Sequence, residues 1–172
     1  MKKAPLLALA FISSVAAFTV YSCRKDKSYP VEPHIEYLDF VKYPGHDSAD
    51  FKITFTDGDG DIGLDKGDTF SPFNKGSKYF NNIYLVYQYK DSLGYHYYTT
   101  PPVAPDTIPD TLQFAYRIPV ITPFGQSKSL NGEIHVRLYA PYAAHNNFRF
   151  KCYIYDRALH QSNIIDSPDF TP

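Results

Sequence analysis

The feature that most restricts the fold is a strict alternation of apolar and polar residues in several short segments. Residues 51–56 read FKITFT, residues 134–138 read IHVRL and residues 148–154 read FRFKCYI. A period of two places one set of side chains on a core and the other set in water, as in antiparallel sheets. Residues 82–90, NIYLVYQYK, are apolar or aromatic on both faces, which is typical of a central strand. These patterns predict an all-β fold.

Proline and the aromatic residues favour the same fold class. Fourteen prolines interrupt the 172 residues, and an interior proline breaks a helix. Thirteen phenylalanines and sixteen tyrosines are too many large rings for a disordered chain. We expect strands at about residues 35–41, 50–56, 82–90, 95–100, 113–121, 132–139, 147–156 and 163–170. About seven or eight strands at this spacing predict an immunoglobulin-like antiparallel β-sandwich, with a small barrel as the competing architecture.

The first 22 residues have the layout of a secretory signal, because lysines at the start precede an apolar stretch that runs to Val20. Residues 20–23, VYSC, resemble a bacterial lipobox, in which Cys23 receives a diacylglyceryl group and anchors the mature chain. An uncleaved membrane anchor and a soluble exported protein are the alternatives. We expect three parts, a signal peptide at 1–22, a lipid-anchored tether at 23–34 and a β-sandwich domain at 35–172.

The charge balance and the cysteines limit the expected partners and chemistry. Lysine and arginine number 17 and aspartate and glutamate number 18, which gives no electrostatic case for nucleic acid as a partner. If Cys23 is lipidated, Cys152 is the remaining cysteine, and its place in an alternating segment predicts an inert buried thiol. We expect an outer-membrane lipoprotein, with its periplasmic or surface orientation left open.

One segment carries chemistry that is typical of a site. Residues 54–68, TFTDGDGDIGLDKGD, bring five carboxylates close together, and glycines between the first three let those side chains converge. Ca²⁺ takes about six to eight oxygen ligands, so clustered aspartates and loop carbonyls suit it. The candidate metal ligands are Asp57, Asp59, Asp61, Asp65 and Asp68.

The same aspartate run leaves other interpretations open. Ile62 stands where an EF-hand loop needs glycine, and strands flank the segment, so a calcium loop at the edge of a sandwich is favoured over an EF-hand. A metal-free turn is the alternative, because aspartate and glycine both favour turns. A third possibility is a structural ion pair with Arg157, whose guanidinium can hold two carboxylate oxygens. In each case the expected role is structural.

Three segments also carry a resemblance to known proteins. They are the leader ending in Ser22 and Cys23, the sequence FTDGDGDIG at 55–63 and the sequence DRALHQSN at 156–163. Together they resemble a family of Bacteroidota-type envelope lipoproteins of unassigned function. The last segment is also similar to the stretch that precedes the final strand of bacterial immunoglobulin-like modules. The resemblance implies an envelope location and a sandwich fold, and it supplies no catalytic residue.

Motifs typical of catalysis are absent from the sequence. It contains no helical histidine pair of a zinc protease, no nucleophile elbow and no glycine-rich phosphate loop, so we expect no enzymatic activity. We expect a binding or structural role at the cell envelope.

The rival hypothesis is a glycan-binding module, because tyrosine rings can stack on sugars while their hydroxyls form hydrogen bonds. The candidate platform is Tyr84, Tyr95, Tyr97 and Tyr98. The competing interpretation is that these rings fill and flank the core. A third hypothesis is an accessory subunit docked on an outer-membrane protein.

Overall fold

The fold consists of strands joined by loops. The computed structural model describes residues 29–44, 47–99, 111–121, 128–139, 141 and 145–171. The strands in these ranges are β1 (His34–Lys42), β2 (Ser48–Asp57), β3 (Ile83–Asp91), β4 (Gly94–Tyr97), β5 (Gln113–Tyr116), β6 (Leu130–Tyr139), β7 (Phe148–Ile154) and β8 (Ile165–Asp166). Over the same ranges, no helix has the length and apolar character that a membrane span requires. The predicted leader and Cys23 lie outside the described residues.

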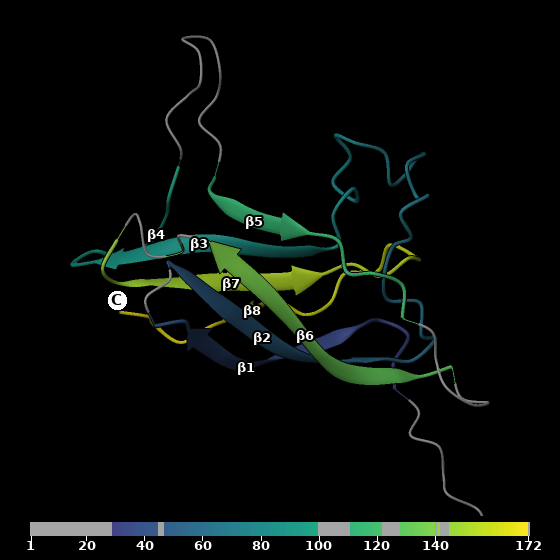
Figure 1. Ribbon diagram of the computed structural model, residues 1–172, viewed down its shortest axis with the longest axis horizontal. Coiled ribbons are helices and arrows are strands. Elements are labelled where there is room, and N and C mark those ends of the chain that lie inside the picture. The colour runs from purple at the N-terminus through teal and green to yellow at the C-terminus, as the bar shows by residue number, and fades with distance from the viewer. Residues whose placement is uncertain are drawn as a thin grey trace, which may run out of the picture.

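Two antiparallel sheets pack face to face and cross obliquely in Figure 1. One sheet has the order β1-β2-β6. The other has the order β4-β3-β7-β8, and β5 pairs with the part of β3 that β4 leaves free. This arrangement matches that of immunoglobulin-like domains. The sheet of β1, β2 and β6 corresponds to strands A, B and E, and β3, β7 and β8 of the other sheet correspond to strands C, F and G. The predicted all-β immunoglobulin-like sandwich is therefore confirmed.

Strand β2 shows how the alternating sequence sets the two faces of its sheet. It pairs with β6 along its whole length, from Ser48 opposite Tyr139 to Asp57 opposite Leu130. Phe51 and the apolar residues at every second position after it are buried, and the residues between them are partly exposed. The alternation continues to the last residue of the strand. Asp57 is therefore on the same face as Phe51, and its carboxylate is buried at the end of the core.

Aromatic rings from both sheets fill the core. Phe51 from one sheet and Phe150 from the other are fully buried, and their ring centroids lie 5.8 Å apart in an edge-to-face contact. Tyr87 packs against the same ring of Phe150 at 5.7 Å. Cys152 is also fully buried, and burial raises the pKa of its thiol. The predicted inert thiol is therefore a buried core residue.

The last strand is shorter than expected because serine side chains replace part of its pairing. Strand β8 has two residues, whereas the sequence predicts a strand over about 163–170. On either side of β8, the hydroxyls of Ser162 and Ser167 accept the backbone N–H groups of Ile154 and Phe150, each at 3.0 Å. The backbone N–H groups of the two serines donate in return to the carbonyls of the same residues. The edge of β7 is thus satisfied without a long partner strand.

Candidate functional site

The aspartate loop begins at the inward-facing end of β2 and is tightly packed. A Cβ atom added to Gly58 would lie 2.3 Å from the carbonyl oxygen of Tyr29 and 2.5 Å from that of Pro30. A side chain at this position would therefore collide with the segment that precedes β1. Gly60 has a φ of +71°, a conformation that glycine adopts without strain, and it turns the chain back toward Asp57.

Three carboxylates converge in this loop. Asp57, Asp59 and Asp61 each offer one oxygen, and these oxygens lie within 4.8 Å of one another. The Oδ2 atom of Asp57 accepts the backbone N–H groups of Asp61 at 2.9 Å and Ile62 at 3.2 Å. The Oδ1 atoms of all three aspartates are buried and have no hydrogen-bond partner. A buried polar atom without a partner is unfavourable by about 1–3 kcal/mol, and more when it is charged, so the geometry suits a bound cation.

The electrostatics of the cluster lead to the same conclusion. Burial and the neighbouring carboxylates of Asp59 and Asp61 raise the pKa of Asp57 to about 7. Burial and the carboxylate of Asp156 raise the pKa of Asp61. Both effects disfavour the charged form, because it loses water and gains like-charged neighbours. Among the described residues, no lysine or arginine forms an ion pair with Asp57, Asp59 or Asp61.

A fourth carboxylate, Asp156, lies beside the cluster and has a partner of its own. Its Oδ1 atom accepts the backbone N–H of His160 at 2.7 Å, and its Oδ2 atom lies 2.8 Å from Nδ1 of the same histidine. The hydrogen bond and the charge of Asp156 raise the pKa of His160. The backbone N–H of Arg157 donates to the carbonyl of Asp61 at 3.3 Å, which joins this turn to the aspartate loop.

The sequence analysis does not single out Asp156 or His160 as part of the site. The available signal was their spacing of four residues inside the DRALHQSN segment, which places both groups in one tight turn after β7.

The other two predicted metal ligands, Asp65 and Asp68, form a separate cluster with Arg157. The guanidinium of Arg157 holds both carboxylate oxygens of Asp68, at 2.6 and 2.7 Å. The Oδ2 atom of Asp68 also accepts the backbone N–H of Asp65 at 2.7 Å, and Oδ1 of Asp65 accepts that of Gly67 at 2.8 Å. Arg117 donates to the backbone carbonyls of Asp65 and Asp68, at 3.0 Å in each case. The ion pair considered for Arg157 is therefore present, and its partner is Asp68.

The four platform tyrosines do not form one continuous surface. Tyr84 lies near the start of β3, whereas Tyr95 on β4 pairs with Lys90 near the other end of β3. Tyr98 packs edge-on against Tyr87, with 6.1 Å between their ring centroids. Tyr97 is 52% exposed. Tyr84, Tyr95 and Tyr97 therefore share the outer face of the sheet but lie near different ends of β3, whereas Tyr98 packs on a core residue.

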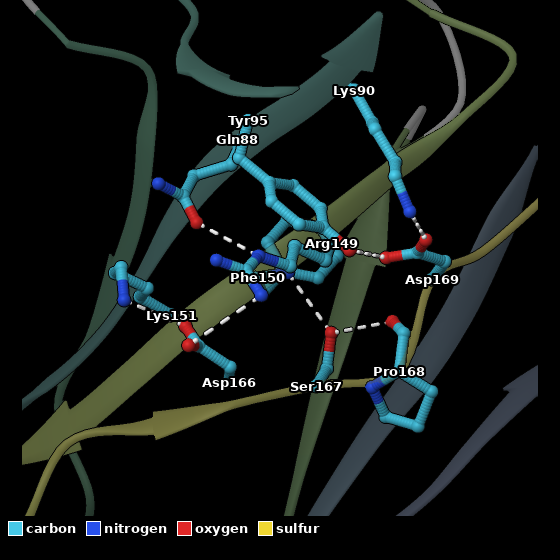
Figure 2. Close-up of polar contacts among 10 residues, drawn as sticks. All are labelled: Gln88, Lys90, Tyr95, Arg149, Phe150, Lys151, Asp166, Ser167, Pro168 and Asp169. Carbon is cyan, nitrogen blue, oxygen red and sulfur yellow. Dashed lines mark hydrogen bonds and ion pairs between the residues drawn. The ribbon is translucent and has the colours of Figure 1, made fainter. Parts of the chain in front are cut away.

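Tyr95 is held in a network of polar contacts on the outer face of its sheet (Figure 2). Its hydroxyl donates to Asp169 at 2.5 Å, and the guanidinium of Arg149 lies 3.5 Å from its ring centroid. Arg149 also donates to Gln88 at 2.9 Å, and Lys90 pairs with Asp169 at 2.9 Å. The ring and the hydroxyl of Tyr95 are thus already engaged, and the network fastens the C-terminal segment to the sheet.

Comparison with protein-family models, with curated proteins and with solved structures found no significant match to this chain. The resemblance to envelope lipoproteins therefore stays a prediction. Among the described residues, the aspartate cluster is the arrangement of side chains with the most specific chemistry.

Proposed function

We propose that this protein is a lipid-anchored, non-catalytic component of the cell envelope whose β-sandwich is stabilised by Ca²⁺. The observation that carries the calcium part is the set of buried Oδ1 atoms on Asp57, Asp59 and Asp61 that lack hydrogen-bond partners. The cluster offers carboxylate oxygens alone, which is the ligand type that hard cations such as Ca²⁺ prefer. Backbone carbonyls or water would complete the shell.

The position of the cluster explains how a cation would act on stability. Asp57 ends β2 in one sheet, and the backbone of Asp61 contacts Arg157 in the turn after β7 of the other sheet. A few residues further on, the backbone N–H of Leu64 donates to the carbonyl of Ile118 at 2.8 Å. A cation in the loop would therefore fasten the ends of the two sheets to each other. This is a structural role that requires no catalytic group.

Thermal unfolding of residues 24–172 in EDTA and in increasing Ca²⁺ tests the calcium site. We expect the melting temperature to rise with calcium, by about 5–10 °C at a calcium concentration of about 100 Kd, because the folded state alone binds the ion. Asp59→Asn should remove this rise. The matched control is Asp65→Asn, in the same loop but outside the cluster, which should respond to calcium as the wild type does. Equal melting temperatures in EDTA and in calcium would contradict the proposal.

The anchoring part rests on the leader and the lipobox, and it is tested with the full-length chain in a bacterial host. Wild-type protein should fractionate with membranes and carry the mass of its acyl chains, because several acyl chains together anchor stably. Cys23→Ser should release the protein into the soluble exported fraction without that mass. Cys152→Ala, which changes the cysteine in the core, should leave fractionation unchanged. Membrane association of Cys23→Ser equal to wild type would argue against lipidation.

A further inference from the structure

A groove on the outer face of the five-stranded sheet has no role in the aspartate cluster. It lies between the sheet and the loop that precedes β3, and its volume is about 510 Å³. In Figure 1 this loop projects beside the end of the sheet at which strands β5 and β7 end. The volume is within the range of about 300–1,000 Å³ that is typical of small-molecule sites.

Three tyrosines give the groove a corner of flat surfaces. Tyr84 of β3 and Tyr153 of β7 lie opposite each other in the sheet, and their rings are stacked with centroids 5.2 Å apart and an angle of 15°. The ring of Tyr155 stands at 84° to Tyr84 and at 85° to Tyr153. The rings of Tyr84 and Tyr153 are thus nearly parallel, and the ring of Tyr155 is nearly perpendicular to both.

Polar side chains complete the lining. Amide groups come from Asn81 and Gln113, a hydroxyl comes from Ser77 and an ammonium group comes from Lys78. No carboxylate is among the residues that line the groove. The Nζ atom of Lys78 lies 4.6 Å from the centroid of the Tyr79 ring and 5.9 Å from that of the Tyr155 ring, so the positive charge lies beside the three tyrosines.

The groove is preformed, because internal hydrogen bonds hold its walls. The hydroxyl of Tyr84 donates to the carbonyl of Lys78 at 2.6 Å, which fastens the loop to the sheet. The hydroxyl of Tyr155 donates to Gln161 at 2.9 Å, and its backbone N–H donates to the carbonyl of Asn82 at 2.9 Å. A ligand would therefore spend little binding energy on ordering the site.

We propose that this groove binds a short glycan of one or two sugar rings. A sugar ring presents C–H groups on its faces, which suit tyrosine rings, and hydroxyls on its edge, which suit amide and ammonium groups. A purely apolar ligand would leave the amides of Asn81 and Gln113 without partners. The lysine and the absence of lining carboxylates favour sugars that are neutral or carry an acid group. Of the four platform tyrosines expected from the sequence, Tyr84 alone lines this groove.

Titration of ¹⁵N-labelled residues 24–172 with N,N′-diacetylchitobiose, maltose and digalacturonic acid, each up to about 10 mM, tests the proposal. At least one sugar should shift the amide signals of residues 76–81 and 153–155 in a saturable way. Tyr153→Ala should weaken that binding by about tenfold or more, because the mutation removes one of the stacked rings. Tyr97→Ala, which changes an exposed tyrosine outside the groove, should bind as the wild type does.

Gln113→Ala is a second variant that does not disturb the aromatic packing. The exposed amide lies on β5, and its loss should weaken binding while the amide spectrum of the rest of the domain stays unchanged. Absence of saturable shifts in the groove with all three sugars would overturn the proposal, and so would unchanged affinity in Tyr153→Ala. Calcium binding is measured separately in the aspartate variants, so either result leaves the proposed function as it is.

Discussion

Replacing Asp57 with asparagine is expected to stabilise the metal-free protein at about pH 8 and to abolish its response to Ca²⁺. The carboxylate is fully buried, and its pKa of about 7 means that it is charged at this pH beside two other acidic groups. Asparagine has the same shape. Its carbonyl can accept the N–H groups of Asp61 and Ile62, and its amide can donate to the neighbouring carboxylates. We expect a gain of about 2–4 kcal/mol in the free energy of unfolding.

Urea unfolding in EDTA at about pH 5 and pH 8 measures this effect. The advantage of the asparagine variant should shrink at the lower pH, because the wild-type carboxyl is then protonated. Asp65→Asn is the control, since Asp65 lies in the same loop and caps the N–H of Gly67 outside the cluster. An Asp57→Asn protein that is less stable than wild type at both pH values and still responds to calcium would exclude this account of the cluster.

The wild-type protein in EDTA should show the matching pH dependence. The folded state raises the pKa of Asp57 from its ordinary value to about 7, so the contribution of this residue to stability is fully present below about pH 4 and is lost as the pH rises through 7. The pKa of His160 is also raised, so its contribution to stability is likewise lost as the pH rises above the usual pKa of histidine. Asp50, Asp68, Asp91 and Asp169 have lowered pKa values, so they change stability in a more acidic range. Stability should therefore fall between about pH 5 and pH 8.

Phe150→Ala is expected to lower the free energy of unfolding by about 3–5 kcal/mol, because it leaves a cavity where rings from both sheets meet. The ring of Phe150 is fully buried. Its partners lie in both sheets and in the segments beside them, and they are Phe40, Phe51, Tyr87, Phe114, Phe148 and Phe170. The surrounding strands are held by their hydrogen bonds, so the space cannot close easily.

Urea unfolding of the two phenylalanine variants checks this result. Phe150→Leu, which keeps most of the volume, should lose much less stability than Phe150→Ala and guards against a variant that does not fold. Phe70→Ala is the surface control, because this ring is 83% exposed, and it should change the free energy by less than about 0.5 kcal/mol. Similar losses for Phe70→Ala and Phe150→Ala would mean that the core does not depend on this ring cluster.

Most strands could be predicted because their alternation follows directly from burial on one face. The errors fall where side chains or loops replace strand pairing. The expected strand at about 113–121 ends at Tyr116, because the N–H of Ile118 donates to the side chain of Asn82 at 2.6 Å and its carbonyl accepts from Leu64. The segment around β8 is short because Ser162 and Ser167 bind the edge of β7. Local sequence carries no periodic signal for such contacts between distant residues.

The site was predictable in part. The alternation in β2 already places Asp57 on the same face as Phe51, so a carboxylate in the core follows from the sequence. The division of the five aspartates into two clusters does not, because it depends on Arg157 reaching Asp68 across the fold. The separation of the platform tyrosines has a similar reason. Tyr84 lies near one end of β3, where its ring stacks on Tyr153, and Tyr95 pairs with Lys90 near the other end.

The strand order also predicts the order in which strands pair during folding. Strands β1 and β2 are neighbours in the chain, so their hairpin closes over a short distance. The second edge of β2 pairs with β6, which follows three other strands in the sequence. We therefore expect this edge to pair later than the edge that faces β1. Pairing between distant strands loses loop-closure entropy before stabilising contacts form, so it is slower than pairing between neighbouring strands. Before β6 pairs, β2 has an open edge that can form hydrogen bonds with another chain and an aromatic face that is exposed. We therefore expect aggregation during folding to begin at this stage.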